Sequence, residues 1–266
     1  MKNNNFKTRF TSGLAKILFA SLFLFASIQE GYSTHISGGD FQYRCIGTDS
    51  FLVTLNVYRF CGGPGVGAAA MPTVVNIQFQ SPCGTQSASV QRDSMVEVSQ
   101  LCPQQLSQSS CNSGPLPGMQ HGFFSTIVVL PPCAAGPWTM SYSICCRNST
   151  ANLTGQPLLT IDAMLNNHIA PCNNSPRFSG QPIPYVCAGA PVNYSFGTIE
   201  PDGDSIVYAF AHLMSNNITT LVPYQAGYSP TVPFNVPVTL NPRTGQLSFT
   251  PVFVAGVPFW VVKVCA

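Results

Sequence analysis

Short runs in which apolar and polar residues alternate restrict the fold of this sequence more than any other feature. In the run Phe51–Arg59, every second residue from Phe51 to Val57 is large and apolar, which gives a β-strand one apolar face. Behind the first 33 residues there is no long helical repeat of apolar positions, and glycine and proline interrupt every region. Short strands separated by such turns predict an all-β chain built of β-sandwiches. In the first part of the chain we expect strands at 51–59, 74–79, 88–98, 123–130, 138–146 and 158–165.

A polar turn at residues 172–176 divides this strand pattern in two. We therefore expect two β-sandwich domains, residues 34–172 and 173–266, each of ordinary domain size. Apolar residues continue almost to the end, so we expect the second sandwich to be incomplete and the natural chain to resume its strand after Ala266. In this second domain we expect strands at 184–186, 192–196, 205–212, 236–240, 246–249 and 258–265.

The first 33 residues have the features of a signal peptide. A basic leader is followed by the uncharged apolar run Ile17–Ser27, whose length of about eleven residues is too short for a bilayer-spanning helix of roughly twenty. Gly31 and Ser33 occupy the −3 and −1 positions of a cut before Thr34. A cut directly behind the apolar run and an uncleaved anchor are the alternatives. We expect a secreted or cell-surface protein with no transmembrane span in its mature segment.

Removal of the leader changes the charge of the chain. Seven basic and eight acidic residues follow Ser33, so the formal charge of +2 becomes about −1. No basic stripe is left to contact phosphates, and we therefore expect no nucleic-acid partner.

All eleven cysteines follow the leader, and an exported chain with this density predicts a disulfide framework. A zinc site is the alternative, but no Cys pair has the C-x₂-C spacing and the four histidines are scattered. The odd count leaves one cysteine free, bonded to another chain, or without its partner. We predict a disulfide between Cys187 and Cys265, which alone follow the boundary. In the rival pairing, Cys265 bonds a residue beyond the end and Cys187 bonds the first domain.

Two arrangements of cysteines allow a chemical role as an alternative. Adjacent Cys145 and Cys146 could be a redox pair, but in a strand their side chains point to opposite faces, so we expect each to bond a different partner. His121, which lies between Cys111 and Cys133 in the sequence, could serve as the base of a Cys–His pair. Because we expect oxidised cysteines throughout, we predict no catalytic residue and no enzyme.

The sharpest signal for a ligand is the sequence Glu200-Pro-Asp-Gly-Asp-Ser205 between two predicted strands. Alternating acidic residues around a glycine turn supply several oxygens at close range, as hard cations such as Ca²⁺ require. An EF-hand is excluded, because no helices flank the segment and Leu213 would occupy the twelfth loop position, where glutamate is needed. The alternative is a solvated Asp-Gly turn that binds nothing.

Several motifs of the chain resemble those of known surface proteins. In the second part, residues 173–178, 200–208 and 241–251 resemble the N-x-P-x-F, D-x-D-G-D-x-L-x-Y and T-G-x-L-x-x-T-P motifs of cadherin-like, immunoglobulin-like modules of bacterial surface proteins. In the first part, residues 34–39, 43–45, 57–61 and 145–148 resemble the opening domain of very large secreted proteins of Bacteroidota. Those proteins carry a distant C-terminal domain associated with gliding motility and are exported by type IX secretion.

The resemblance implies an adhesin-like or surface-coat role, immunoglobulin-like sandwiches and calcium that stiffens module junctions. Carried over by position, Asn174, Asp202 and Asp204 are the implied ligands. Glu200 stands where these modules usually have Asp, and its longer side chain can still coordinate. We therefore predict Ca²⁺ bound by these four residues across the domain junction.

Together these features predict a non-catalytic structural or adhesive module of a large cell-surface protein, followed by further modules. The surface ligand or glycan that it contacts is not encoded in any motif. The rival from another class is an accessory carbohydrate-binding module of a secreted hydrolase, which exposed aromatic side chains would favour. Trp138 and Trp260 both lie in strand-like runs, so we expect them in the core.

Overall fold

The computed structural model describes residues 36–62, 70–145, 147, 150–155, 157–180, 185–216, 218–252 and 260–266. The predicted signal peptide lies outside these residues. We call residues 36–172 the first part and residues 173–266 the second part. Across the described ranges, no helix is long and apolar enough to cross a membrane.

One sheet of the first part is antiparallel and four-stranded. Its order is β1 (Ile36–Gly47), β2 (Ser50–Phe60), β6 (Met119–Val129) and β5 (Ser94–Glu97). Two 3-10 helices, η1 (Pro103–Gln108) and η2 (Ser110–Asn112), connect β5 to β6. The alternation predicted for residues 51–59 is confirmed, since Phe51, Val53, Leu55 and Val57 of β2 are fully buried.

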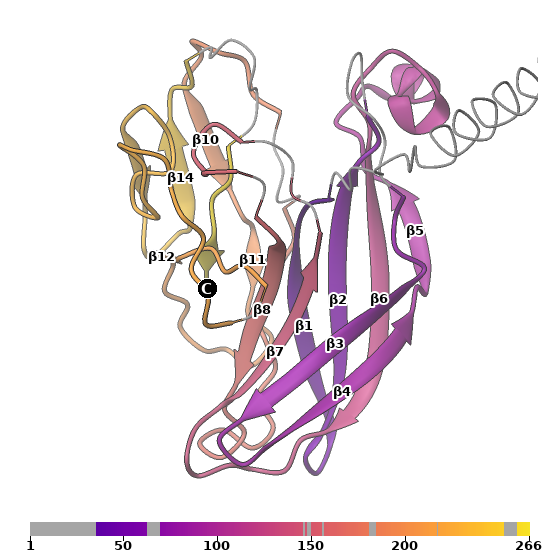
Figure 1. Ribbon diagram of the computed structural model, residues 1–266, viewed down its shortest axis with the longest axis vertical. Helices are drawn as coiled ribbons and strands as arrows, with labels where there is room; N and C mark the ends of the chain where they lie inside the picture. Colours follow the sequence, from indigo (N-terminus) through magenta and orange to yellow (C-terminus); the bar gives the residue numbers. More distant parts are fainter. Residues whose placement is uncertain are drawn as a thin grey trace, which may run out of the picture. The chain divides into compact units, whose positions relative to one another are not determined.

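A second antiparallel sheet contains β4 (Gly84–Gln91), β3 (Val74–Ser81), β7 (Trp138–Ile144) and β8 (Leu159–Leu165), in that order. In Figure 1, β3 and β4 lie across β2 and β6. Apolar side chains from both sheets form a single core, in which Leu55 and Phe124 of the first sheet join Phe79 and Met140 of the second. The predicted all-β class is confirmed.

β1 is a strand that the sequence pattern does not reveal. Gly38 and Gly39 contribute no side chain to an alternating pattern, and glycine weakens the strand signal. At Gly39 the missing side chain is a requirement, because a Cβ there would collide with the Asn56 carbonyl oxygen and the Ile161 side chain. The close approach of β1 to β2 and β8 therefore depends on this glycine.

The predicted strand 88–98 is divided between the two sheets. β4 ends at Gln91, and β5 begins at Ser94 in the other sheet. The Arg92 backbone N–H donates to the Thr73 carbonyl oxygen and the Asp93 N–H to that of Phe123, so these two residues carry the chain from one sheet to the other.

The second part has much shorter strands than the sequence predicts. Residues 205–212 contain only the two-residue β12 (Ala209–Phe210), which pairs with β15 (Val264–Cys265). In the predicted strands 184–186 and 258–265 the structure describes residues 185–186 and 260–265, of which only Val264–Cys265 form a strand, β15. The other small sheets are β10 (Val192–Ser195), β14 (Gln246–Phe249) and β13 (Val238–Leu240) in one, and β9 (Arg177–Phe178) with β11 (Thr198–Ile199) in the other.

Three disulfides join described cysteines: Cys45–Cys172, Cys61–Cys111 and Cys83–Cys133. Their Cα–Cα distances of 5.2, 4.9 and 5.8 Å are ordinary for disulfides. The predicted disulfide framework is confirmed, and such bonds are typical of proteins that fold in oxidising compartments. Cys145 is also disulfide-bonded. Cys146 lies outside the described residues, and with it the prediction for the adjacent pair.

The structure does not contain the predicted Cys187–Cys265 bond, since both residues carry free, exposed thiols. Cys265 lies in β15, directly opposite Ala209 of β12. Cys187 lies in a turn away from any strand, and the turn's Gly189 N–H donates to the Pro251 carbonyl oxygen. The two cysteines are therefore not on neighbouring strands, which the prediction assumed.

Candidate functional site

The structure brings together two of the four predicted calcium ligands, Asn174 and Asp202. The Asn174 backbone N–H donates to Asp202 Oδ2, and its side-chain amide donates to Asp202 Oδ1, both over 2.6 Å. Asn174 lies two residues after Cys172 in the sequence, whereas Asp202 lies in the turn after β11. The contact thus ties the linker to the acidic turn.

A fifth residue, Asn173, belongs to this group although the sequence motif does not single it out. One end of its side-chain amide lies 2.8 Å from Asp202 Oδ2 and 3.3 Å from Asp204 Oδ2. This end is the amide nitrogen, because an oxygen there would face only acceptors, and it donates a hydrogen bond to each carboxylate.

The Glu200 carboxylate bonds the backbone of the acidic turn and not a side chain. Its Oε2 accepts a hydrogen bond of 2.7 Å from the Asp204 backbone N–H, which closes the turn. Gly203, inside this turn, has a φ of 84°, in the left-handed region that favours glycine. Glu200 therefore shapes the loop that presents Asp202 and Asp204.

β1 fixes the linker from its other side. The Cys45 backbone N–H donates to Asn174 Oδ1 over 3.0 Å, and the Tyr43 N–H donates to Ser175 Oγ over 2.8 Å. The Ser175 N–H in turn donates to the Tyr43 carbonyl oxygen. Together with the Cys45–Cys172 disulfide, these bonds align residues 172–175, which we call the junction, along β1.

The electrostatics of the junction agree with this packing. Burial raises the pKa of Tyr43, and the nearby Asp202 carboxylate raises it further. Within the described residues, the one ion pair joins Lys263 to Asp162, so no cationic side chain neutralises the acidic turn. Among all the residues that the structure describes, no three His, Cys, Asp or Glu side chains are grouped closely enough to hold a metal ion. The calcium site stays a prediction that depends on asparagine oxygens as well as carboxylates.

A second contact between the two parts centres on Asn152, which is completely buried. Its side-chain amide donates to the carbonyl oxygens of Pro233 and Val261, over 3.0 and 2.6 Å, and its oxygen accepts from the Val261 N–H over 3.2 Å. Next to it, Leu153 packs against Leu213 and other apolar side chains of the second part. We call this group the Asn152 clamp.

His121 is held in a polar network rather than beside a thiol. Cys111 and Cys133 are both in disulfides, so the alternative of a Cys–His pair has no nucleophile. His121 Nε2 lies 3.0 Å from Asn56 Oδ1, and Asn56 Nδ2 donates to Asp40 Oδ1 over 2.8 Å. The orientation of Asn56 therefore assigns the proton of the neutral ring to Nε2.

Burial between aromatic rings keeps this histidine uncharged near neutral pH. The imidazole stacks on Tyr58 with a centroid distance of 4.2 Å and packs against Phe123 at 3.8 Å. Burial lowers the pKa of His121 to about 4. Burial also raises the pKa of Asp40, against the effect of its hydrogen bonds from Asn56 and Gln42. The network thus cross-links β1, β2 and β6 through side chains.

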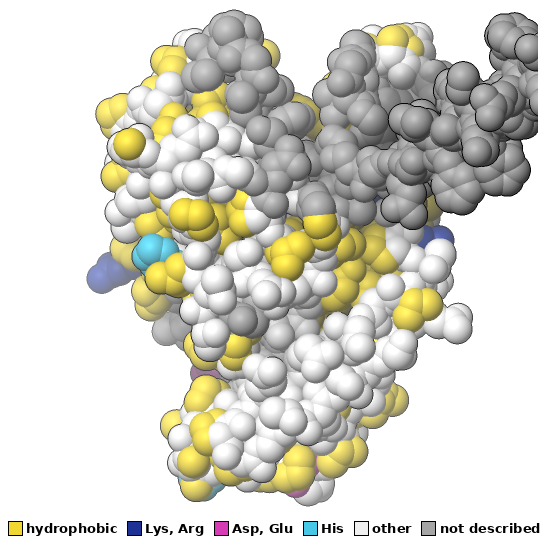
Figure 2. Space-filling view, in the orientation of Figure 1, with side chains coloured by type: hydrophobic (Ala, Val, Ile, Leu, Met, Phe, Trp, Pro, Cys, Tyr) yellow, Lys and Arg dark blue, Asp and Glu magenta, His cyan; other side chains and the backbone are white. Residues whose placement is uncertain are grey.

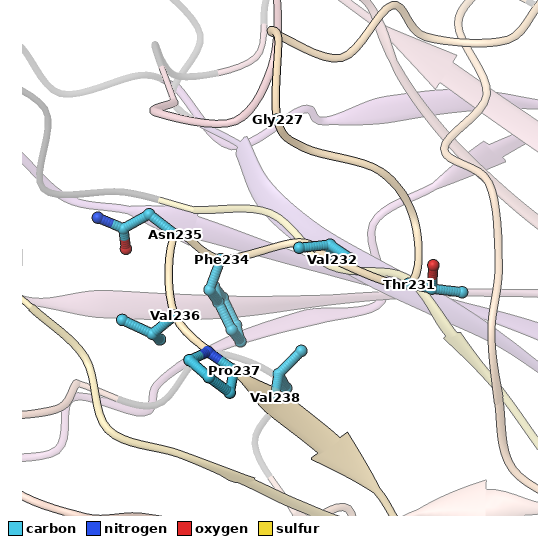
Figure 3. A pocket seen from close by; sticks show the side chains of 8 residues that line it. All are labelled: Gly227, Thr231, Val232, Phe234, Asn235, Val236, Pro237 and Val238. Atoms are coloured by element: carbon cyan, nitrogen blue, oxygen red, sulfur yellow. The ribbon is translucent and has the colours of Figure 1, made fainter.

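One hollow of about 420 Å³ in the second part is lined by eight residues from Gly227 to Val238, the first residue of β13. Figure 3 shows Phe234 between Thr231 and Asn235, with no ionisable side chain among the eight that line the hollow. Phe234 stacks on Phe249 with a centroid distance of 4.6 Å. Charged side chains are also sparse on the face shown in Figure 2.

The tryptophans do not form an exposed platform for a sugar. Trp138 is buried in the core of the first part, as predicted, and its Nε1–H donates to the Pro131 carbonyl oxygen over 2.8 Å. Trp260 is half-buried.

No family model, no curated protein and no solved structure matches this chain.

Proposed function

We propose that the chain is the exported front part of a large, non-catalytic cell-surface protein with a structural or adhesive role. In this proposal both parts are immunoglobulin-like β-sandwich domains, residues 34–172 and 173–266, the second of them incomplete. The mature chain projects from the cell surface, and its exposed loops contact the binding partner.

The observation that carries this proposal is the fixed junction. Asn174 is bonded on one side to β1, through the Cys45 N–H, and on the other to Asp202 of the second part. A disulfide precedes it, and the Asn152 clamp adds a second point of attachment. Flexible linkers between domains contain few such contacts, so this one supports a rigid spacer.

Export and rigidity can be tested separately. N-terminal sequencing of the secreted chain should find Thr34 as its first residue, and retention of residues 1–33 would contradict the cleavable leader. Hydrogen exchange should show the amides of Tyr43, Cys45 and Asn174 protected like those of the core strands. Exchange as fast as that of exposed loops would contradict a rigid junction.

The adhesive role requires a binding assay. Fluorescent full chain should bind immobilised matrix proteins or glycans from a surface panel. Competition by one soluble sugar at all positive sites would instead support the carbohydrate-binding module.

Calcium is the proposed stiffener of the junction, held by Asn174, Glu200, Asp202 and Asp204. Titration calorimetry should show Ca²⁺ binding that the double variant Asp202→Ala, Asp204→Ala abolishes. Asp93→Ala is the matched control, because Asp93 is exposed and has no part in the junction. The absence of binding heat in the unmodified protein would reject the site and leave the disulfide and the clamp as the sole stiffeners.

A further inference from the structure

Three exposed cysteines of the described chain carry free thiols: Cys102, Cys187 and Cys265. All other described cysteines are in disulfides. In an oxidising compartment an exposed thiol exchanges with a disulfide within reach, and a disulfide oxidant converts two neighbouring thiols into a disulfide. The positions of these three residues therefore decide which of them can pair.

A hydrogen bond between the two parts brings the segments of Cys102 and Cys187 together. The Tyr185 backbone N–H donates to Gln100 Oε1 over 2.9 Å. Each cysteine follows one partner of this bond by two residues, a stretch of at most about 7 Å. Because both segments lie outside the sheets and both thiols are exposed, they can turn toward each other without breaking a strand pair.

Cys265 is in a different environment. It is part of β15, held opposite Ala209, and Lys263 two residues before it is paired with Asp162 of β8. Neither of these strands takes part in the contact between Tyr185 and Gln100. Cys102 is thus the partner that the structure offers to Cys187.

We propose that Cys102 and Cys187 form a disulfide in the mature protein. This bond would join the two parts covalently in addition to the polypeptide chain itself. The proposal rests on the proposed export, which supplies the oxidising conditions. Each thiol loses a proton, and the two sulfurs together give two electrons to a disulfide oxidant such as oxidised glutathione, which leaves as two thiols. The new bond and Cys45–Cys172 then enclose the linker residues 173–186 at both ends.

Trypsin separates the three cysteines clearly. Its cleavage sites place Cys102 in the peptide 93–147, Cys187 alone in the peptide 178–243, and Cys265 in the tripeptide 264–266. The full chain, oxidised with a glutathione redox pair, is alkylated under denaturing conditions without reduction and then digested. We expect peptide 178–243 linked to peptide 93–147, and peptide 264–266 alkylated.

Single variants identify the cysteine within peptide 93–147. Cys102→Ser should release peptide 178–243 in fully alkylated form, whereas Cys265→Ser should leave the linkage unchanged. Alkylated Cys187 in the unmodified chain, or its linkage to peptide 264–266, would overturn the proposal.

The same digest tests the proposed function independently. The Cys45–Cys172, Cys61–Cys111 and Cys83–Cys133 bonds serve as internal controls. If these three form while Cys187 is alkylated, only the new bond is refuted. If none of them forms under oxidising conditions, the disulfide-reinforced exported fold is refuted as well.

Discussion

Replacement of Asn152 by alanine should weaken the attachment of the second part to the first by about 3 kcal/mol. The side chain is completely buried and makes three hydrogen bonds, to Pro233 and twice to Val261. A net contribution of roughly 1 kcal/mol for each bond gives this value, and the buried backbone groups left unpaired would increase it.

Asn152→Asp is the sharper variant, because it keeps the shape of the side chain and changes only its donor. The aspartate oxygen can still accept from the Val261 N–H, but its other oxygen faces two carbonyl oxygens. Burial without a cation raises the pKa of such a carboxyl, so its folded value lies above its unfolded value. Its ionisation therefore lowers stability as the pH rises, so the loss of stability relative to the unmodified protein should be smaller near pH 4 than near pH 7.

Urea denaturation followed by tryptophan fluorescence measures both effects, since Trp260 lies beside Val261 of the clamp. Asn76→Ala, at an exposed position of β3, is the control and should change the unfolding free energy by less than about 0.5 kcal/mol. An Asn152→Ala cost as small as that of the control would refute the role of the clamp. An equal cost of Asn152→Asp at both pH values, measured against the unmodified protein at the same pH, would refute its donor role.

Two other perturbations test the first part. Burial lowers the pKa of His121 to about 4 from an ordinary 6.5. The contribution of the neutral ring to the free energy of unfolding is therefore fully present above pH 6.5 and is lost as the pH falls toward 4. His121→Gln should flatten this loss in urea midpoints measured across that range, and an unchanged profile would contradict it. Gly39→Ala should cost 2 kcal/mol or more, by the order of magnitude typical of overpacking, since its Cβ would meet Asn56 and Ile161. Gly38→Ala, with open space around it, is the matched control, and equal thermal shifts for the two would contradict the close packing.

The core of the first part could be predicted from the sequence where apolar and polar residues alternate along a strand. β2 is an example, since its alternation alone identifies Phe51, Val53, Leu55 and Val57 as core residues. β1 could not be predicted, because the requirement for Gly39 depends on how closely β2 and β8 approach. In the second part the apolar runs overstate the strands, since turns and loops separate paired segments of two to four residues.

The junction was predictable in part. The order of the motifs identified Asn174 and Asp202, which are in contact, but the backbone role of Glu200 and the contribution of Asn173 depend on the turn's conformation. Cysteine pairing was beyond the sequence for a similar reason. Spacing along the chain does not tell which loops meet in space, and the assumption of adjacent terminal strands predicted a Cys187–Cys265 bond that the structure does not contain.

The order of the disulfides along the chain has a consequence for survival outside a cell. Cys61–Cys111 and Cys83–Cys133 interleave, and both lie inside the loop closed by Cys45–Cys172. A protease that cuts once anywhere between residues 45 and 172 therefore cannot release a fragment, because a covalent path still joins the new ends. Between residues 83 and 111 all three loops overlap. After a cut in this stretch, which contains η1, three disulfides still join the two new ends.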